Sequence, residues 1–169
     1  METVRSEAFR DAMRHLPAGV TVVTVRAGEQ VHGLTVSAFC SVSPDPPLVA
    51  VVIDQRHTAY PLLETAGAVF AVNILHQDQV ELSNRFAWLK DEDRFLAGEW
   101  KPAVTGAPVL ADALAWLDCE MRERYPAGTH TIYLGEVVAS SVPRPDEPPL
   151  IYWNRGYRKL SRHAGDSGG

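Results

Sequence analysis

Three prolines, Pro44, Pro46 and Pro47, interrupt an otherwise strand-forming stretch between Gly33 and Asp54. Proline fixes its backbone φ angle and lacks the N–H group that a central strand must donate. The sequence SPDPP is therefore expected to form a rigid turn, and the run LVAVVI after it begins a new strand. Because this run is apolar on consecutive residues, we expect both of its faces to be covered.

Small and hydroxyl-bearing side chains precede that turn. They provide short hydrogen-bond donors and acceptors, and they let a flat ligand approach the backbone closely. We interpret the stretch as a ligand cradle formed by Thr35, Ser37, Ala38, Cys40, Ser41 and Ser43. The alternative is an ordinary hairpin loop in which Ser41 and Ser43 cap the turn.

Length and composition fit one globular domain, which we place at residues 1–160, followed by a disordered tail at 161–169. The chain has 169 residues, of which 46% are hydrophobic, and no apolar run approaches the roughly 20 residues of a membrane helix. Its amphipathic, acid-containing N-terminus resembles neither a secretory nor a transit peptide, so we expect a cytoplasmic protein. A net charge of -5 without a dense basic cluster argues against nucleic-acid binding.

The two cysteines, Cys40 and Cys119, are far apart in the sequence and lack CxxC spacing. The histidines other than His57 and His130 share no metal-type pattern. We therefore expect two reduced thiols and no metal site.

The residue pattern predicts a mainly β fold with a few helices. Helical spacing of apolar residues indicates three helices, capped by Ser6, Thr58 and Asp78. Strand patterns occur at 20–25, 31–39, 47–54, 68–75, 113–125 and 130–142, with a short final pair around Gly156. Residues 90–108 are interpreted as a long loop. Many short strands with few helices predict a closed antiparallel barrel with helical decoration.

Four stretches in fixed order, PAGVTVVTV, GLTVSAFCSVSPDPPL, FAVNIL and THTIYLGEV, resemble the short-chain flavin reductase family. Its members are the reductase components of two-component flavin-dependent monooxygenases. The resemblance extends over about residues 9–160. It implies an FMN-binding split β-barrel that forms a homodimer.

The resemblance also implies which side chains contact FMN or FAD. Two segments match the flavin cradle: Thr35, Val36, Ser37 and Ala38 along the ring, then Cys40, Ser41, Val42 and Ser43. Near the end of the fold, stacking surface and polar groups come from Tyr152, Trp153, Asn154 and Tyr157. Aromatic core packing is the alternative for this last group. We interpret Trp88, Trp100 and Trp116 as core or interface anchors rather than as a platform for the flavin.

A flavin phosphate needs a cationic or amide-rich anchor. Arg56, His57 and Thr58 lie between a predicted strand end and a helix start, where they offer a guanidinium, an imidazole and a hydroxyl. The alternative is a solvated loop with Thr58 as a helix cap. Asn73 is a polar residue in a buried strand, so its amide either faces the flavin or satisfies neighbouring backbone.

His130 is the candidate catalytic residue. In the family, a Gly-Asp-His turn at this place helps to position the nicotinamide against the flavin, whereas this chain has Gly128, Thr129 and His130. The threonine replaces the acid, which puts in doubt any role that needs a carboxylate beside the imidazole. A structural histidine near a strand start is the alternative.

The resemblance implies an NAD(P)H:flavin oxidoreductase that reduces FMN or FAD and releases it to a separate monooxygenase. No GxGxxG motif follows a first strand, so a Rossmann site for NADH or NADPH is not supported. Thr129 favours one alternative, a noncatalytic flavin-binding carrier or sensor. A second alternative is another planar ligand, such as haem or a deazaflavin. The choices between FMN and FAD, and between NADH and NADPH, stay open at this point.

Overall fold

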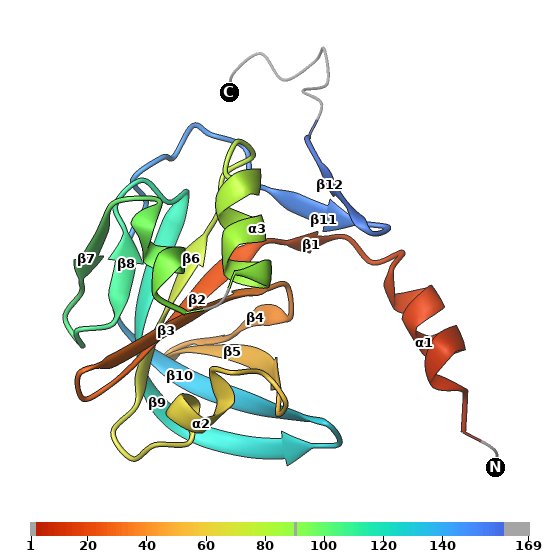
Figure 1. Cartoon of the computed structure of the whole chain (residues 1–169), viewed down its shortest axis with the longest axis horizontal. Helices are drawn as coiled ribbons and strands as arrows, with labels where there is room; N and C mark the ends of the chain where they lie inside the picture. The colour runs from red at the N-terminus through yellow and green to blue at the C-terminus, as the bar shows by residue number, and fades with distance from the viewer. Residues whose placement is uncertain (1–2, 90, 161–169) are drawn as a thin grey trace.

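The computed structural model describes residues 3–89 and 91–160, so the tail predicted at 161–169 lies outside the described residues. Its main element is a seven-stranded antiparallel sheet (Figure 1). The strands follow the order β3 (Gln30–Val36), β2 (Thr21–Ala27), β6 (Val69–Ile74), β9 (Ala115–Ala127), β10 (His130–Ser141), β5 (Pro47–Asp54) and β4 (Phe39–Pro44). Two smaller sheets contain β1 (Ala18–Gly19), β11 (Ile151–Trp153) and β12 (Gly156–Arg158), and β7 (Trp100–Pro102) with β8 (Pro108–Leu110).

The large sheet curls until β3 contacts β5. It stays open, with β3 and β4 as its two edge strands. This confirms the split barrel and corrects the prediction of a closed one. Pro44 and Pro47 face each other across the turn between β4 and β5, at the outer edge of the sheet. An edge strand tolerates proline because no neighbouring strand needs a hydrogen bond from the N–H group that proline lacks.

Strand β2 is buried on both faces. Val23 and Val25 point into the barrel, where they join the cluster that contains Phe70 and Tyr133. Val22 points the other way, into a second cluster that holds a helix against the sheet. Alternate side chains of a strand point to opposite faces, so both clusters depend on this strand.

Strand β5 only partly matches its prediction. Val49, Ala50 and Val51 are all buried, as the consecutive apolar run indicated. Leu48 and Val52 are partly exposed, however, so the outer face is covered incompletely. The cause is its place next to the edge strand β4.

Three α-helices and one 3₁₀ helix accompany the sheets: α1 (Ser6–Met13), α2 (Tyr60–Leu63), α3 (Val80–Trp88) and η1 (Asp91–Leu96). Every residue of α1 is exposed, and the helix stands away from the barrel (Figure 1). Among the helices of the described residues, none is both long and apolar enough to cross a membrane.

The predicted helix caps are wrong. The residues before α1, α2 and α3 are Arg5, Ala59 and Gln79. The Thr58 hydroxyl instead lies 3.0 Å from His32 Nε2, and the Asp78 carboxylate pairs with Lys159 at 3.0 Å. Ser6 is the first residue of its helix rather than its cap.

The segment predicted as a long loop at 90–108 contains η1, β7 and the start of β8. Phe95 and Trp100 pack against Phe86 of α3, with each pair of ring centroids 5.2 Å apart. These contacts hold residues 90–108 in a defined structure, although the sequence of this segment is charged and rich in Gly and Pro. The hairpin β11–β12 confirms the short final strand pair predicted around Gly156, and its turn residues are Asn154 and Arg155.

Gly33 permits the close approach of α3 to β3. A Cβ atom at this position would lie 2.4 Å from Phe86 Cε1. Overpacking of this kind costs about 1–3 kcal/mol, so we expect Gly33→Ala to lower Tm by about 3–10 °C. Differential scanning calorimetry measures the change. Gly19→Ala is the matched control, because its Cβ would meet nothing within 4 Å. Equal effects of the two substitutions would contradict this packing.

Candidate functional site

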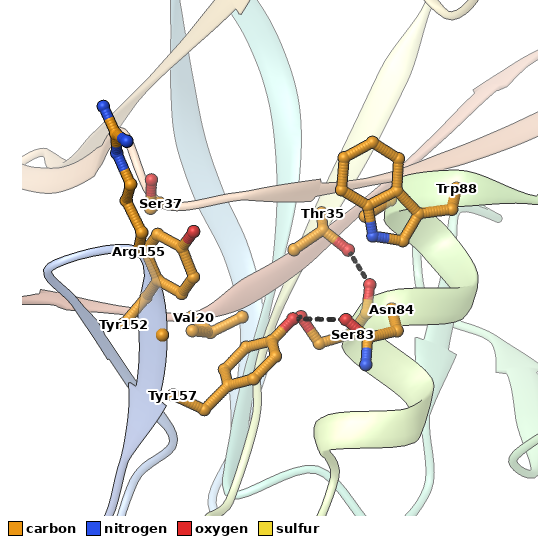
Figure 2. A pocket seen from close by; sticks show the side chains of 11 residues that line it. Val20, Thr35, Ser37, Ser83, Asn84, Trp88, Tyr152, Arg155 and Tyr157 are labelled. Carbon is orange, nitrogen blue, oxygen red and sulfur yellow. Dashed lines mark hydrogen bonds between the residues drawn. The ribbon is translucent and has the colours of Figure 1, made fainter. Parts of the chain in front are cut away.

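A pocket of about 320 Å³ lies between the end of β3, the helix α3 and the β11–β12 hairpin (Figure 2). We call it the α3 pocket. Its polar and aromatic side chains are Thr35, Ser37, Ser83, Asn84, Trp88, Tyr152, Arg155 and Tyr157. They carry hydroxyl, amide, aromatic and guanidinium groups. The pocket is thus equipped to bind and orient a ligand rather than to exchange protons with it at neutral pH.

Hydrogen bonds tie the three walls of the α3 pocket together. Thr35 Oγ1 donates to the Ser83 carbonyl at 2.6 Å, which joins β3 to α3. The Tyr157 hydroxyl donates to Asn84 Oδ1 at 2.9 Å and lies 2.9 Å from Ser83 Oγ. Because tyrosine has one hydroxyl proton, Ser83 must donate to Tyr157. The hairpin is therefore held against α3 by two bonds at one oxygen.

Aromatic side chains form opposite sides of the pocket. Tyr152 and Tyr157 meet edge to face, with ring centroids 5.5 Å apart. Figure 2 shows Trp88 across the pocket from Tyr152 and Arg155. Trp88 is 80% exposed, so it is not a core residue. Trp100 and Trp116, in contrast, pack against the buried clusters as expected.

A second pocket, of about 290 Å³, lies on the other side of Tyr152. We call it the Trp153 pocket. It shares Ser37, Tyr152 and Arg155 with the α3 pocket and adds Ala38, Trp153 and Asn154. The structure therefore brings together seven of the predicted ligand contacts: Thr35, Ser37, Ala38, Tyr152, Trp153, Asn154 and Tyr157.

The other predicted cradle residues lie elsewhere. The Val36 side chain is buried in the barrel core. Cys40, Ser41 and Val42 are exposed on the edge strand β4. Ser43 Oγ accepts from the Asp45 N–H at 3.2 Å and donates to the Asp45 carbonyl at 3.1 Å, which is the turn-capping arrangement. Within this chain, β4 contributes none of the side chains that line the α3 pocket.

Asn73 is fully buried and its amide is occupied on both sides. Nδ2 donates to the Val22 carbonyl at 3.1 Å, and Oδ1 accepts from the Leu110 N–H at 2.7 Å. Of the two roles considered for this residue, the structure shows the bonds to neighbouring backbone. They join β2 and β8 across β6.

Arg56, His57 and Thr58 are neighbours, but each group already has a partner. Asp54 accepts two bonds from the Arg56 guanidinium, at 3.0 and 2.6 Å, and these bonds hold the pKa of Asp54 well below its usual range. His57 Nδ1 accepts from the Ala59 N–H, and burial, followed by the nearby positive charge of Arg94, lowers the pKa of His57. This imidazole is therefore neutral at pH 7.

His130 begins β10 and pairs with Asp54 across the ladder to β5. Its Nδ1 lies 2.9 Å from the Thr129 hydroxyl, so the threonine supplies a hydrogen-bond partner where the family turn has an acid. His130 is not among the residues that line the α3 pocket. The β9–β10 turn lies away from α3 and from the β11–β12 hairpin in Figure 1.

Both cysteines are free thiols. Cys40 is exposed, whereas burial, helped by the charge of Asp118, raises the pKa of Cys119 to about 12. Cys119 therefore stays protonated in the barrel core.

Among the polar and aromatic residues that line the α3 pocket, four were not assigned to the flavin site from the sequence: Ser83, Asn84, Trp88 and Arg155. One signal was available. Asn84 and Trp88 are four residues apart on a predicted helix, which places them on one face. No sequence pattern showed which element that face would meet.

Comparison with known proteins gives a consistent result. A family profile described as "Flavin reductase like domain" matches residues 13–161. The chain is 41% identical over 158 residues to "Actinorhodin polyketide dimerase" of Streptomyces coelicolor, which covers 93% of this chain and 88% of that protein. It is 40% identical over 154 residues to "4-hydroxyphenylacetate 3-monooxygenase, reductase component" of Thermus thermophilus, with coverage of 91% and 96%.

A solved structure shows the same similarity. The NADH:FAD oxidoreductase of Streptomyces globisporus C-1027, in complex with NAD and FAD fragments, aligns with a TM-score of 0.85 and 32% identity. The alignment covers 99% of this chain and 100% of that one. The similarity thus includes the barrel, α3 and the hairpin that form the site.

Removal of the Asn73 amide should affect stability. Asn73→Ala removes one bond to the Val22 carbonyl and leaves the Leu110 N–H without its side-chain acceptor inside the protein, so we expect a loss of about 1–3 kcal/mol in the free energy of unfolding. Urea titration measures this loss. Asn84→Ala, at an exposed amide, should change it by less than about 1 kcal/mol. An Asn73→Ala protein of unchanged stability would contradict the structural role.

Proposed function

Because this chain belongs to the flavin reductase-like family, we propose that it is an NAD(P)H:flavin oxidoreductase that reduces FMN or FAD. The nucleotides themselves supply the chemistry, a hydride passing from the nicotinamide C4 to the flavin N5. The protein has to bind both rings and hold them in register. Its side chains need not include an acid–base pair.

The observation that carries the proposal is the α3 pocket. Its volume lies at the lower end of the range for small-molecule sites. Aromatic side chains on opposite sides suit a flat ring, and hydroxyl and amide groups between them suit its polar edge. The isoalloxazine ring is therefore assigned to this pocket, against Thr35 and Ser37, with Trp88 on one side and Tyr157 on the other.

We also assign a partner and a location. A relative named as the reductase component of a monooxygenase supports the release of reduced flavin to a separate monooxygenase. Flavin is then a substrate that leaves after reduction rather than a retained group. We place this reaction in the cytoplasm.

A homodimer is part of the proposal. Helix α1 exposes Phe9 and Met13, and the segment beside it exposes Val4 and Leu16, all without cover in a single chain. Apolar side chains in such an arrangement favour a protein partner. His130 lies away from the α3 pocket of its own chain, so its predicted role toward the nicotinamide requires a second copy that brings the partner subunit's His130 to the pocket.

An activity assay tests the function. Oxidation of NADH and NADPH is followed with FMN, FAD and riboflavin supplied separately under defined oxygen. We expect turnover that saturates with flavin. Flavin binding without turnover would move the assignment to a carrier or sensor, and absence of both would contradict flavin as the ligand.

The assay is repeated with a pocket variant. Loss of one aromatic contact is worth about 0.5–1.5 kcal/mol, so Trp88→Ala should weaken flavin binding by about 2- to 10-fold. Stability should change little because Trp88 is exposed. The control is Leu96→Ala, at a 79% exposed apolar residue outside the α3 pocket lining. Equal flavin affinity in both variants would contradict the assignment of the isoalloxazine ring to the α3 pocket.

His130→Ala tests the nicotinamide role. If the imidazole positions the nicotinamide, we expect kcat/KM for NADH to fall by about 3- to 10-fold, the value of one neutral hydrogen bond, while the flavin Kd stays constant. His15→Ala, at an exposed histidine, is the control. Unchanged NADH kinetics in His130→Ala would leave this histidine with a structural role only.

A further inference from the structure

The turn that carries His130 lies at the tip of the β9–β10 hairpin (Figure 1). Ala127 pairs with His130, so Gly128 and Thr129 form a two-residue turn, and Gly128 has a φ of 62°. A Cβ atom at Gly128 would meet nothing within 4 Å. Packing therefore does not hold the tip of this hairpin, and its position depends on hydrogen bonds.

Gln55, the residue after the end of β5, supplies these hydrogen bonds from the neighbouring strand. Its backbone N–H donates to the Thr129 carbonyl at 3.0 Å. Its side-chain Nε2 donates to the His130 carbonyl at 3.1 Å and to Thr131 Oγ1 at 3.3 Å. An amide nitrogen carries two protons, so both side-chain bonds form together. Three consecutive residues centred on His130 are thus bonded to one glutamine.

The His130 imidazole is oriented by a hydroxyl group. Its Nδ1 lies 2.9 Å from the Thr129 Oγ1 atom. The acid opposite His130 in the ladder is Asp54, and both of its carboxylate oxygens bond to Arg56. Within the described part of the chain, no group is bonded to Nε2 of this ring. A bond at one ring nitrogen sets the role of the other, so Nε2 is the atom left to meet a ligand.

We propose that Gln55 and Thr129 are positioning residues for His130. Gln55 fixes the backbone of the turn, and Thr129 orients the imidazole so that Nε2 faces the nicotinamide. This proposal rests on the proposed function, because it concerns the same histidine. A displacement of about 1 Å in a group that orients a reacting ring is enough to slow the reaction. The two residues act on the reaction only through His130.

Two substitutions test the proposal. Gln55→Leu removes the Nε2 donor and keeps the backbone N–H, and Thr129→Val removes the hydroxyl and keeps the shape of the side chain. We expect each to lower kcat/KM for NADH by about 2- to 5-fold, the value of a weak neutral hydrogen bond. Flavin Kd, measured by fluorescence quenching, should stay constant.

Gln77→Leu is the matched control. Gln77 is also a partly exposed glutamine, and its backbone N–H is also bonded, to the Pro148 carbonyl at 2.9 Å. The same substitution there should leave NADH kinetics unchanged. A loss as large as that in Gln55→Leu would show an effect unrelated to the β9–β10 turn and would overturn the role of Gln55.

Double variants show whether the effect passes through the imidazole. Gln55→Leu and Thr129→Val are each combined with His130→Ala. If both residues act through His130, each should lower kcat/KM for NADH by less than about 1.5-fold further once the imidazole is gone. Additive losses would show a general effect on the fold or on flavin binding, and they would overturn the positioning role.

The remaining outcomes separate this proposal from the function on which it rests. Failure of either single substitution to lower kcat/KM, or a weaker flavin Kd in that variant, would overturn the assignment of that residue. Unchanged NADH kinetics in His130→Ala would overturn the proposal as a whole, while flavin reduction by the unmodified chain would still support the proposed function. An unmodified chain that reduces no flavin would contradict the proposed function itself and, with it, the positioning role.

Discussion

Burial of β2 on both faces is the constraint on which the other features depend. Val23 and Val25 hold this strand in the barrel core, while Val20 and Val22 hold the second cluster, which includes Leu82 and Phe86 of α3. The same short run of alternating valines therefore stabilises the barrel and fixes the helix that forms one wall of the α3 pocket. A change in the register of β2 by one residue would exchange these two faces and separate the pocket from the barrel.

In the site, apolar packing, hydrogen bonds and charge have separate roles. Buried contacts set the positions of β3 and α3, and the hydrogen bonds from Thr35, Ser83 and Tyr157 then determine the width of the pocket. Among the residues that line the α3 pocket, Arg155 is the charged one. This arrangement suits a ligand that brings its own reactive atoms, because the protein has to supply shape and orientation.

Much of this architecture is visible in the sequence, for physical reasons. The β-branched run at 20–25 predicts the strand β2 directly. The resemblance located Thr35 and Tyr157, which the fold brings together although they are far apart in the chain. Other features depend on contacts that local pattern does not encode. Phe95 and Trp100 give the charged segment at 90–108 a defined fold only because they pack against Phe86. Arg56 pairs with the Asp54 carboxylate because β5 ends at Asp54, which brings the two side chains together.

The exposure of α1 has a consequence for how the protein folds. A helix of eight residues is too short to be stable in water by itself, and here its attachment to the body is through bonds beyond its C-terminal end, from Asn154 and Trp153. If a second copy covers the helix, its backbone amides gain protection from hydrogen exchange only as the copies associate. Folding of the N-terminal segment and assembly then become one concentration-dependent event, and dilution would release the helix while the barrel stays intact.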